Sequence, residues 1–321
     1  MTSPSLKQLI KEFLDHLEIE RNCSLATKRN YKSYLNRFLE FSKIKTADDL
    51  EIEVVRKYRL WLNRQENQRK EPLNKSTQNY YLIALRSFLK YLAKRDIKAL
   101  APEKIELAKM PDRQVTFLEG EDLERFLEAP LKSKEPPIIQ KRDKAILELL
   151  FSTGLRVSEL ANLTQDQINL KKDDFTVRGK GSKLRLVFLS NQAKYWLKQY
   201  LDARQDASLA LFVRHDRAAN KSNDTKHLTP RSIQRLVQYY AKSVGITKRI
   251  TPHVLRHSYA TDLLTSGADI RSVQSLLGHA SITTTQIYTH ITNQQLKDVY
   301  NAFHARKRGR PKKDKGVDDK S

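Results

Sequence analysis

The sequence predicts a mainly α-helical protein in two parts, with one small antiparallel β-sheet in the second part. Three observations predict this. Apolar residues recur at helical spacing through most of the chain, two alternating runs flank a Gly-Lys-Gly-Ser turn, and a stretch with prolines and no periodicity separates two helical regions. Since single hydrophobic cores usually stop growing at about 250 to 300 residues, a chain of 321 residues also favours two domains.

The first hundred residues predict a small all-helical domain, which we place at residues 1–105. Its four amphipathic helices are indicated by apolar residues at helical spacing in the ranges 6–17, 31–39, 54–62 and 76–92. Ser24 and Thr27 are the candidate caps of the second helix and Ser76 of the fourth. The outward faces of these helices are rich in Lys and Arg.

Residues 106–115 predict a linker, and residues 116–305 a second domain whose first helix starts near Glu119. A helix that ends in FSTGLRVSELANL follows, and then the run DFTVRGKGSKLRLVFLS, which predicts a β-hairpin with a lysine at its tip. Thr229 and Pro230 start a further helix that Gly245 closes, and more helices follow to about residue 304. Residues 131–140 and 214–227 predict flexible loops without an assigned function, and 306–321 a basic disordered tail.

The charge of the chain indicates a polyanionic partner. Sixty Lys and Arg residues against 37 Asp and Glu residues give a formal net charge of +23, spread along most of the sequence. No apolar run approaches the roughly 18 residues that a membrane-spanning helix requires, and the first residues lack a signal-peptide core, so we expect a soluble, cytoplasmic protein. The single cysteine, Cys23, excludes an internal disulfide and a thiolate zinc cage. Nucleic acid is therefore the favoured partner.

The segment TPHVLRHSYATDLL places His253 and Arg256 three residues apart, on one face of a helix and close to its N-terminus, where anions are attracted. His253 and His257 could also be two metal ligands. However, the glutamate of the zinc-protease pattern is absent and Arg256 would repel a cation. Taken alone, the stretch also fits a structural helix with one core histidine and a surface arginine.

Four of the eight histidines fall between residues 253 and 290, in the same segment as Tyr288. Cleavage of a phosphodiester without a metal requires cations at the non-bridging oxygens, a base for the nucleophile and an acid for the leaving oxygen. A tyrosine hydroxyl has an unperturbed pKa of about 10, so it needs a neighbouring base or cation to act as a nucleophile. Histidine and arginine can serve both purposes.

Several motifs together resemble those of the tyrosine site-specific recombinases, in the Xer and phage-integrase branch. The resemblance covers nearly the whole chain and is strongest from about residue 140 to 295. The family's catalytic positions are all filled, in order: Arg156 in TGLRVSEL, Lys180 in GKGSK, His253 and Arg256 in PHVLRHSYAT, and His279 and Tyr288 in LLGHASITTTQIYTH. Each match alone is weak, since an isolated tyrosine is usually packed in a core and an isolated Lys180 or Arg156 is an ordinary surface charge.

The resemblance implies a SAM-like core-binding domain followed by a catalytic domain with the DNA breaking-rejoining enzyme fold. It also implies that Tyr288 attacks a DNA phosphate to give a 3′-phosphotyrosyl bond and a 5′-hydroxyl, and needs neither metal nor ATP nor any other cofactor. The family's roles assign the phosphate clamp to Arg156 and Arg256, acid/base chemistry to His253, a phosphate hydrogen bond to His279 and protonation of the leaving oxygen to Lys180.

The resemblance further implies a homotetramer on two double-stranded recombination sites in the nucleoid, with a second recombinase or a motor as possible partners. In such an assembly the helix at residues 293–303 would dock on a neighbouring subunit, although packing within its own domain explains its apolar face equally well. We expect no additional arm-binding domain before the helical one, which favours either Xer-like dimer resolution or the integrase of a small mobile element. A type IB topoisomerase and a catalytically silent DNA-binding protein are the alternatives.

Other residues receive supporting or structural assignments. His257, His290 and Glu159 match positions that are common in the family, and we interpret them as supports for the catalytic groups. Three tyrosines of the first domain are expected in the core: Tyr31, Tyr80 and Tyr81.

The tail contains the run Arg308, Gly309, Arg310, Pro311, which resembles the core of an AT-hook, a segment that inserts arginines into a narrow minor groove. We favour the simpler interpretation, a generic basic tail that makes phosphate contacts, because so short a run occurs easily in a basic protein.

Overall fold

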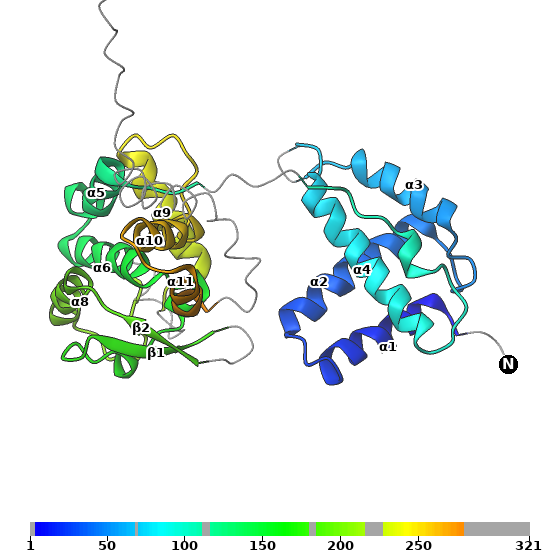
Figure 1. Ribbon diagram of the computed structural model, residues 1–321, viewed down its shortest axis with the longest axis horizontal. Coiled ribbons are helices and arrows are strands. Elements are labelled where there is room, and N and C mark those ends of the chain that lie inside the picture. The colour runs from blue at the N-terminus through cyan, green and yellow to red at the C-terminus, as the bar shows by residue number, and fades with distance from the viewer. Residues whose placement is uncertain (1–3, 68–69, 111–115, 180–183, 216–226, 279–321) are drawn as a thin grey trace, which may run out of the picture. The chain divides into compact units, whose positions relative to one another are not determined.

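The computed structural model describes residues 4–67, 70–110, 116–179, 184–215 and 227–278. The chain divides into two compact units, residues 1–112 and 113–321. The N-terminal unit is built from four helices (Figure 1): α1 (Leu6–Ile19), α2 (Leu25–Ser42), α3 (Ile52–Asn63) and α4 (Lys75–Ala93), followed by the 3₁₀ turn η1 (Pro102–Lys104). Helix α4 contacts each of the other three helices, so its apolar face forms the centre of this core.

The caps of the N-terminal helices correspond to the sequence prediction at one position and differ at another. Ser24 caps α2 by accepting the backbone N–H of Thr27. The predicted cap Ser76 is wrong, because Asn74 caps α4 and accepts from Thr77 at 2.8 Å. Ser76 lies inside the helix, since the asparagine two residues earlier already takes the capping position and accepts the free amide of Thr77.

The predicted tyrosine core of this unit is also wrong at one position. Tyr81 is buried and Tyr31 is half-buried, whereas Tyr80 is 53% exposed. Adjacent residues on a helix point about 100° apart, so Tyr80 and Tyr81 do not face the same core.

The segment after α4 packs onto the N-terminal unit as far as residue 108. Ile105 is buried, and the side-chain amide of Asn79 both donates to the Ala108 carbonyl at 2.9 Å and accepts from the Ala108 N–H at 3.0 Å. These two hydrogen bonds hold an otherwise irregular backbone segment against α4.

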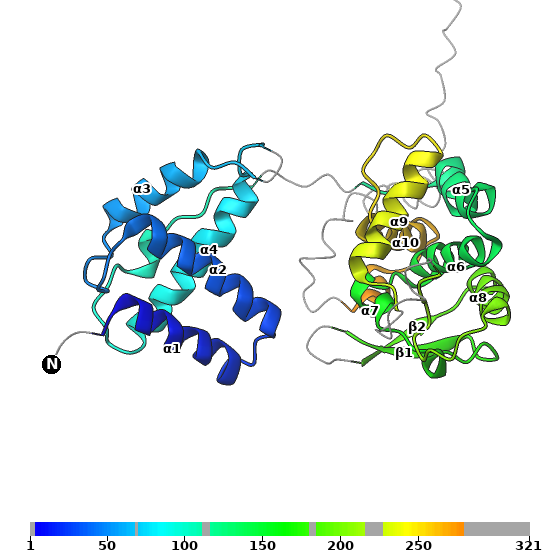
Figure 2. The same ribbon diagram turned by 180° about the vertical axis from the view of Figure 1, so that it is seen from behind.

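The C-terminal unit contains seven described α-helices and one hairpin. Its elements are α5 (Gly120–Glu128), η2 (Ala129–Lys132), α6 (Pro137–Thr153), α7 (Val157–Ala161), η3 (Gln165–Gln167), β1 (Asp174–Arg178), β2 (Leu184–Phe188), α8 (Asn191–Ala203), α9 (Pro230–Ser243), α10 (Pro252–Thr265) and α11 (Ile270–Leu277). Helix α6 is central and contacts α5, α8, α10 and β2, while α7 packs on α9 (Figure 2). The predicted mainly helical class with a small antiparallel sheet is confirmed.

Two predictions for this unit are wrong in their bounds. The loop predicted at 131–140 is limited to residues 133–136, because η2 extends to Lys132 and α6 begins at Pro137, a residue whose fixed φ suits a first helical turn. The helix predicted to end in FSTGLRVSELANL is interrupted at Gly154, which has φ +57° and ends α6, and the short α7 starts anew at Val157.

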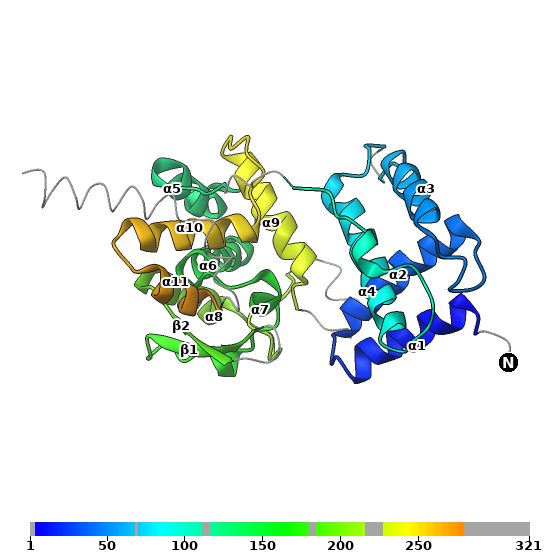
Figure 3. The same cartoon turned by 45° about the vertical axis from the view of Figure 1, so that its right-hand side comes forward.

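Strands β1 and β2 pair antiparallel in the register Val177 opposite Arg185. Phe175, Val177 and Val187 point into the core, and β2 lies beside the end of α11 (Figure 3). No helix in the described part of the chain is long and apolar enough to cross a membrane.

Candidate active site

The turn between α6 and α7 positions Arg156. Gly154 donates its N–H to the Leu150 carbonyl and closes α6, Leu155 is fully buried, and Arg156 then takes the N-cap position of α7. The Arg156 backbone N–H donates to Glu159 Oε2 at 2.9 Å. The backbone around this arginine is therefore fixed on both sides, by a buried leucine and by a carboxylate.

The carboxylate of Glu159 lies between two guanidinium groups. Arg156 Nη1 donates to Oε1 at 2.8 Å, and Arg185 from β2 donates to both oxygens, each at 2.9 Å. Burial raises the pKa of the Glu159 carboxyl, but the hydrogen bonds from Arg185 and Arg156 outweigh burial and hold the pKa below its ordinary value. Glu159 is consequently ionised at neutral pH.

Helix α10 contributes the second arginine. Thr251 caps the helix, Pro252 occupies its first turn, and Arg256 follows one turn later as a buried side chain. Its guanidinium donates to the carbonyl of Gly154 in the α6–α7 turn and to the carbonyl of Leu277 at the end of α11. Arg256 thereby joins three helices of the unit.

Both arginines meet the C-terminal end of α11. Arg156 Nη2 donates to the Gly278 carbonyl at 3.3 Å, next to the Leu277 carbonyl that Arg256 contacts. Gly278 ends the helix with φ +63°, and an added Cβ there would lie 2.9 Å from Arg185 Cδ. The last carbonyls of a helix carry partial negative charge, so this helix end is a natural acceptor for guanidinium groups.

His253 lies one turn before Arg256 at the start of α10. The residue is exposed on one side, and neighbouring atoms displace part of the water around the ring. This partial desolvation lowers the pKa of the imidazole. The positive charges of Arg256 and Arg156 lower that pKa further. The neutral imidazole, which can accept a proton, is therefore favoured at neutral pH.

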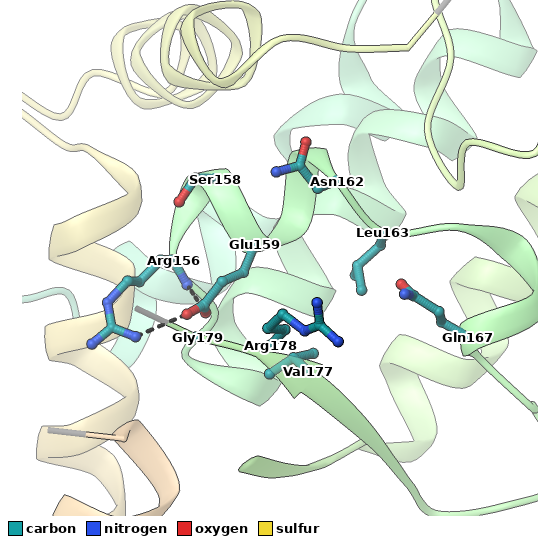
Figure 4. Close-up of a pocket in the computed structure, with 9 residues that line it drawn as sticks. All are labelled: Arg156, Ser158, Glu159, Asn162, Leu163, Gln167, Val177, Arg178 and Gly179. Atoms are coloured by element: carbon teal, nitrogen blue, oxygen red, sulfur yellow. Dashed lines mark hydrogen bonds and ion pairs between the residues drawn. The ribbon is translucent and has the colours of Figure 1, made fainter. Parts of the chain in front are cut away.

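A cavity of about 520 Å³ opens beside Arg156 (Figure 4). It is lined by residues of the α6–α7 turn, α7 and the hairpin: Arg156, Ser158, Glu159, Asn162, Leu163, Gln167, Val177, Arg178 and Gly179. Figure 4 shows the two contacts between Arg156 and Glu159 at one side of this cavity. An anion that enters it would meet Arg156 and the exposed Arg178.

Three of the predicted catalytic residues lie within the described residues, and the structure brings them together: Arg156, His253 and Arg256. Lys180, His279 and Tyr288 lie outside the described residues, as do His290, the helix predicted at 293–303 and the tail residues Arg308, Gly309 and Arg310. In the sequence, Lys180 directly follows Gly179, which lines the cavity, and His279 directly follows Gly278, whose carbonyl Arg156 contacts. Within the described ranges, no group of three His, Cys, Asp or Glu residues could hold a metal ion.

Sequence reasoning missed Arg185. The sequence of β2 contains a signal for it, because this arginine stands among apolar residues. An arginine that such a strand buries must find a carboxylate or carbonyl partner. Glu159 was interpreted as a support, and its contact with Arg156 agrees with that interpretation.

Two family models match the chain: the phage integrase family over residues 116–295, and the phage integrase N-terminal SAM-like domain over residues 10–96. Tyrosine recombinase XerC of Thermodesulfovibrio yellowstonii is 37% identical over 297 residues, which cover 92% of this chain and 95% of the relative. Tyrosine recombinase XerD of Oceanobacillus iheyensis is 35% identical over 306 residues, which cover 94% and 99%.

Solved structures agree in fold. The Tn1549 transposon integrase, in complex with transposon right end DNA, matches with a TM-score of 0.70 at 22% identity, covering 93% of this chain and 99% of that one. XerH site-specific recombinase, bound to palindromic difH substrate, matches with a TM-score of 0.68 at 23% identity, covering 91% and 83%. With two family models and relatives that match along almost the full length, the chain belongs to the phage integrase family and is a tyrosine recombinase.

Proposed function

We propose that the protein cuts DNA at a specific site and rejoins the strands to new partners, through a 3′-phosphotyrosyl intermediate on Tyr288. The observation that carries this proposal is the convergence of Arg156 and Arg256 on neighbouring carbonyls of one helix end, immediately before His279. Two guanidinium groups that meet at one helix end form a clamp suited to a phosphodiester.

In the proposed reaction Arg156 and Arg256 bind the non-bridging oxygens of the phosphate and stabilise the charge that develops on them. Each guanidinium is already oriented by protein carbonyls, so little reorganisation is needed when the phosphate enters. His279 donates a further hydrogen bond to the phosphate.

The proton transfers of the proposed reaction balance. Tyr288 forms the new oxygen–phosphorus bond and passes its proton to the neutral imidazole of His253, whose lowered pKa supports the role of a base. The phosphorus–oxygen bond to the 5′ side breaks, and Lys180 protonates the leaving oxygen. Attack by a 5′-hydroxyl reverses these steps, so the strand is rejoined without ATP. The sequence also contains no P-loop or clustered carboxylate motif.

The proposal includes double-stranded DNA as the partner, a homotetramer that holds two sites together, and action on the nucleoid in the cytoplasm. The net charge of +23 supports a polyanionic partner. The Xer relatives, matched along nearly their whole length, support dimer resolution or mobile-element recombination more than topoisomerase-like relaxation or silent DNA binding.

The test uses nicked suicide DNA from the protein's own genomic neighbourhood, without metal or ATP, and detects a covalent complex on a denaturing gel. We expect a shifted band with the wild type and none with Tyr288→Phe. Tight DNA binding without a Tyr288-dependent band on any flanking DNA would favour a silent DNA-binding protein or a requirement for an activating partner.

A further inference from the structure

Arg185 neutralises the carboxylate that orients Arg156. Glu159 accepts from Arg156 Nη1 and from both terminal nitrogens of Arg185, and the side chains of Arg185 and Glu159 are 8% and 6% exposed. At this low exposure, solvent screens their charges weakly. The three side chains therefore act as one electrostatic unit with a net charge of +1.

Removal of Arg185 would lower the net charge of this group of side chains from +1 to zero. A buried carboxylate would then stand 2.8 Å from the guanidinium with no other arginine on it, and the pair would be neutral overall. The incoming phosphate would be attracted by Arg156 and repelled by Glu159 at nearly the same place. Arg185 thus allows Glu159 to hold Arg156 without cancelling its charge.

The position of Arg185 also links three parts of the site. It lies on β2 opposite Val177, which precedes Lys180 by three residues in the sequence. Its Cδ lies against Gly278 at the end of α11, 2.9 Å from where a Cβ on that glycine would stand. The same side chain therefore contacts the helix end that Arg156 and Arg256 bind.

We propose that Arg185 is a positioning residue for the strand-cleavage reaction: it acts through Glu159, which orients the guanidinium of Arg156, and offsets the negative charge of that carboxylate near the scissile phosphate. The inference rests on the proposed function. The effect of a purely structural role would not depend on the charge of the phosphate. The effect of the proposed role does, and that charge can be removed by a change in the DNA alone.

The experiment measures single-turnover formation of the covalent complex on nicked suicide DNA, with either an ordinary phosphate or an uncharged methylphosphonate at the cleaved position. Three full-length variants are compared: Arg185→Met, the double variant Arg185→Met/Glu159→Gln, and Arg204→Met. Arg204 is the matched control, since it is a buried arginine that binds the carboxylate of Asp206 through two bonds and contacts nearby carbonyls in the loop after α8.

We expect Arg185→Met to cleave ordinary DNA about 100-fold more slowly than the wild type, in the range seen for the loss of one preorganised stabilising group. On methylphosphonate DNA the deficit should shrink to about threefold, because the uncharged group is not repelled by Glu159. The double variant should cleave ordinary DNA faster than Arg185→Met. The deficit of Arg204→Met, whatever its size, should be equal on both DNAs.

The proposal is overturned if Arg185→Met cleaves as the wild type does, if its deficit is as large on methylphosphonate DNA, or if the double variant is slower still. Failure of the proposed function gives a different result, because then the wild type itself forms no Tyr288-dependent complex on ordinary DNA. Thermal unfolding of each variant, measured in parallel, separates a loss of folded protein from a loss of rate.

Discussion

The guanidinium of Arg256 donates to the carbonyl of Gly154, a residue 102 positions earlier in the chain. Gly154 is the point where α6 ends with φ +57°, two residues before Arg156. The contact therefore makes one candidate catalytic arginine a support for the turn that carries the other. Since both guanidinium groups also reach the end of α11, a change at any of these positions should affect stability and cleavage together.

Arg256→Lys should lower the rate of covalent complex formation by about 100-fold, because an ammonium group cannot bridge two carbonyls and a phosphate with the fixed geometry of a guanidinium. The rate is measured in single turnover on nicked DNA, and DNA affinity by gel shift. An Arg256→Lys variant that cleaves at the wild-type rate would show that the bridge is not needed for catalysis.

Gly154→Ala should destabilise the protein by about 2 to 4 kcal/mol, since the strained φ and a Cβ that meets Tyr259 act together. The added Cβ would lie 2.6 Å from Tyr259 Cδ1. Gly245→Ala is the matched control, because Gly245 has φ +77° but no atom within 4 Å of an added Cβ. Urea unfolding of both variants isolates the clash, and equal losses would contradict it.

The cleavage rate should fall at acidic pH as His253 becomes protonated. Partial desolvation and the charges of Arg256 and Arg156 hold its pKa below the ordinary value, so the neutral base persists until the pH falls through that lowered pKa. Arg156→Gln removes one cause, so the pKa rises and the rate should decline at a higher pH than in the wild type. Arg125→Gln, which removes an exposed arginine on α5, should leave the pH of this decline unchanged in the same pH series.

Lys144→Met should cost about 3 to 5 kcal/mol of stability, because it leaves the buried carboxylate of Glu148 without a counter-charge. Lys144 is 1% exposed and binds Glu128 at 2.6 Å and Glu148 at 2.7 Å. The double variant Lys144→Met/Glu148→Leu should recover most of the loss. Lys198→Met, which breaks an exposed pair with Asp202, should cost about 0.5 kcal/mol or less in the same urea experiment.

Deletion of residues 306–321 tests the tail. An AT-hook at Arg308, Gly309 and Arg310 should make the deletion weaken binding to A·T-rich DNA more than to G·C-rich DNA. An equal loss on both, with a smaller salt dependence, would leave only the generic basic tail that we favour. Affinities are compared by gel shift at several salt concentrations.

Helices with a clean apolar stripe could be predicted from the sequence, because one buried face imposes a spacing of three and four residues. The errors have local causes. Asn74 and Ser76 are both good caps, and only the entry path of the chain decides between them. The prolines in 131–140 suggested a loop, although proline also starts a helix, as it does at α6. Gly154 interrupts a pattern that remains apolar on both sides, so the periodicity does not reveal the break.

By itself, the sequence determined the helical class, the hairpin and the basic character, because these depend on residue type and on spacing along a single element. The resemblance of its motifs to those of tyrosine recombinases identified Arg156, His253 and Arg256 as candidates. Only the tertiary structure decided that both arginines reach one end of α11 and that Arg185 lies on Glu159. The reason is that a buried charge must find a partner wherever packing brings one, and that partner can stand a hundred residues away in the chain.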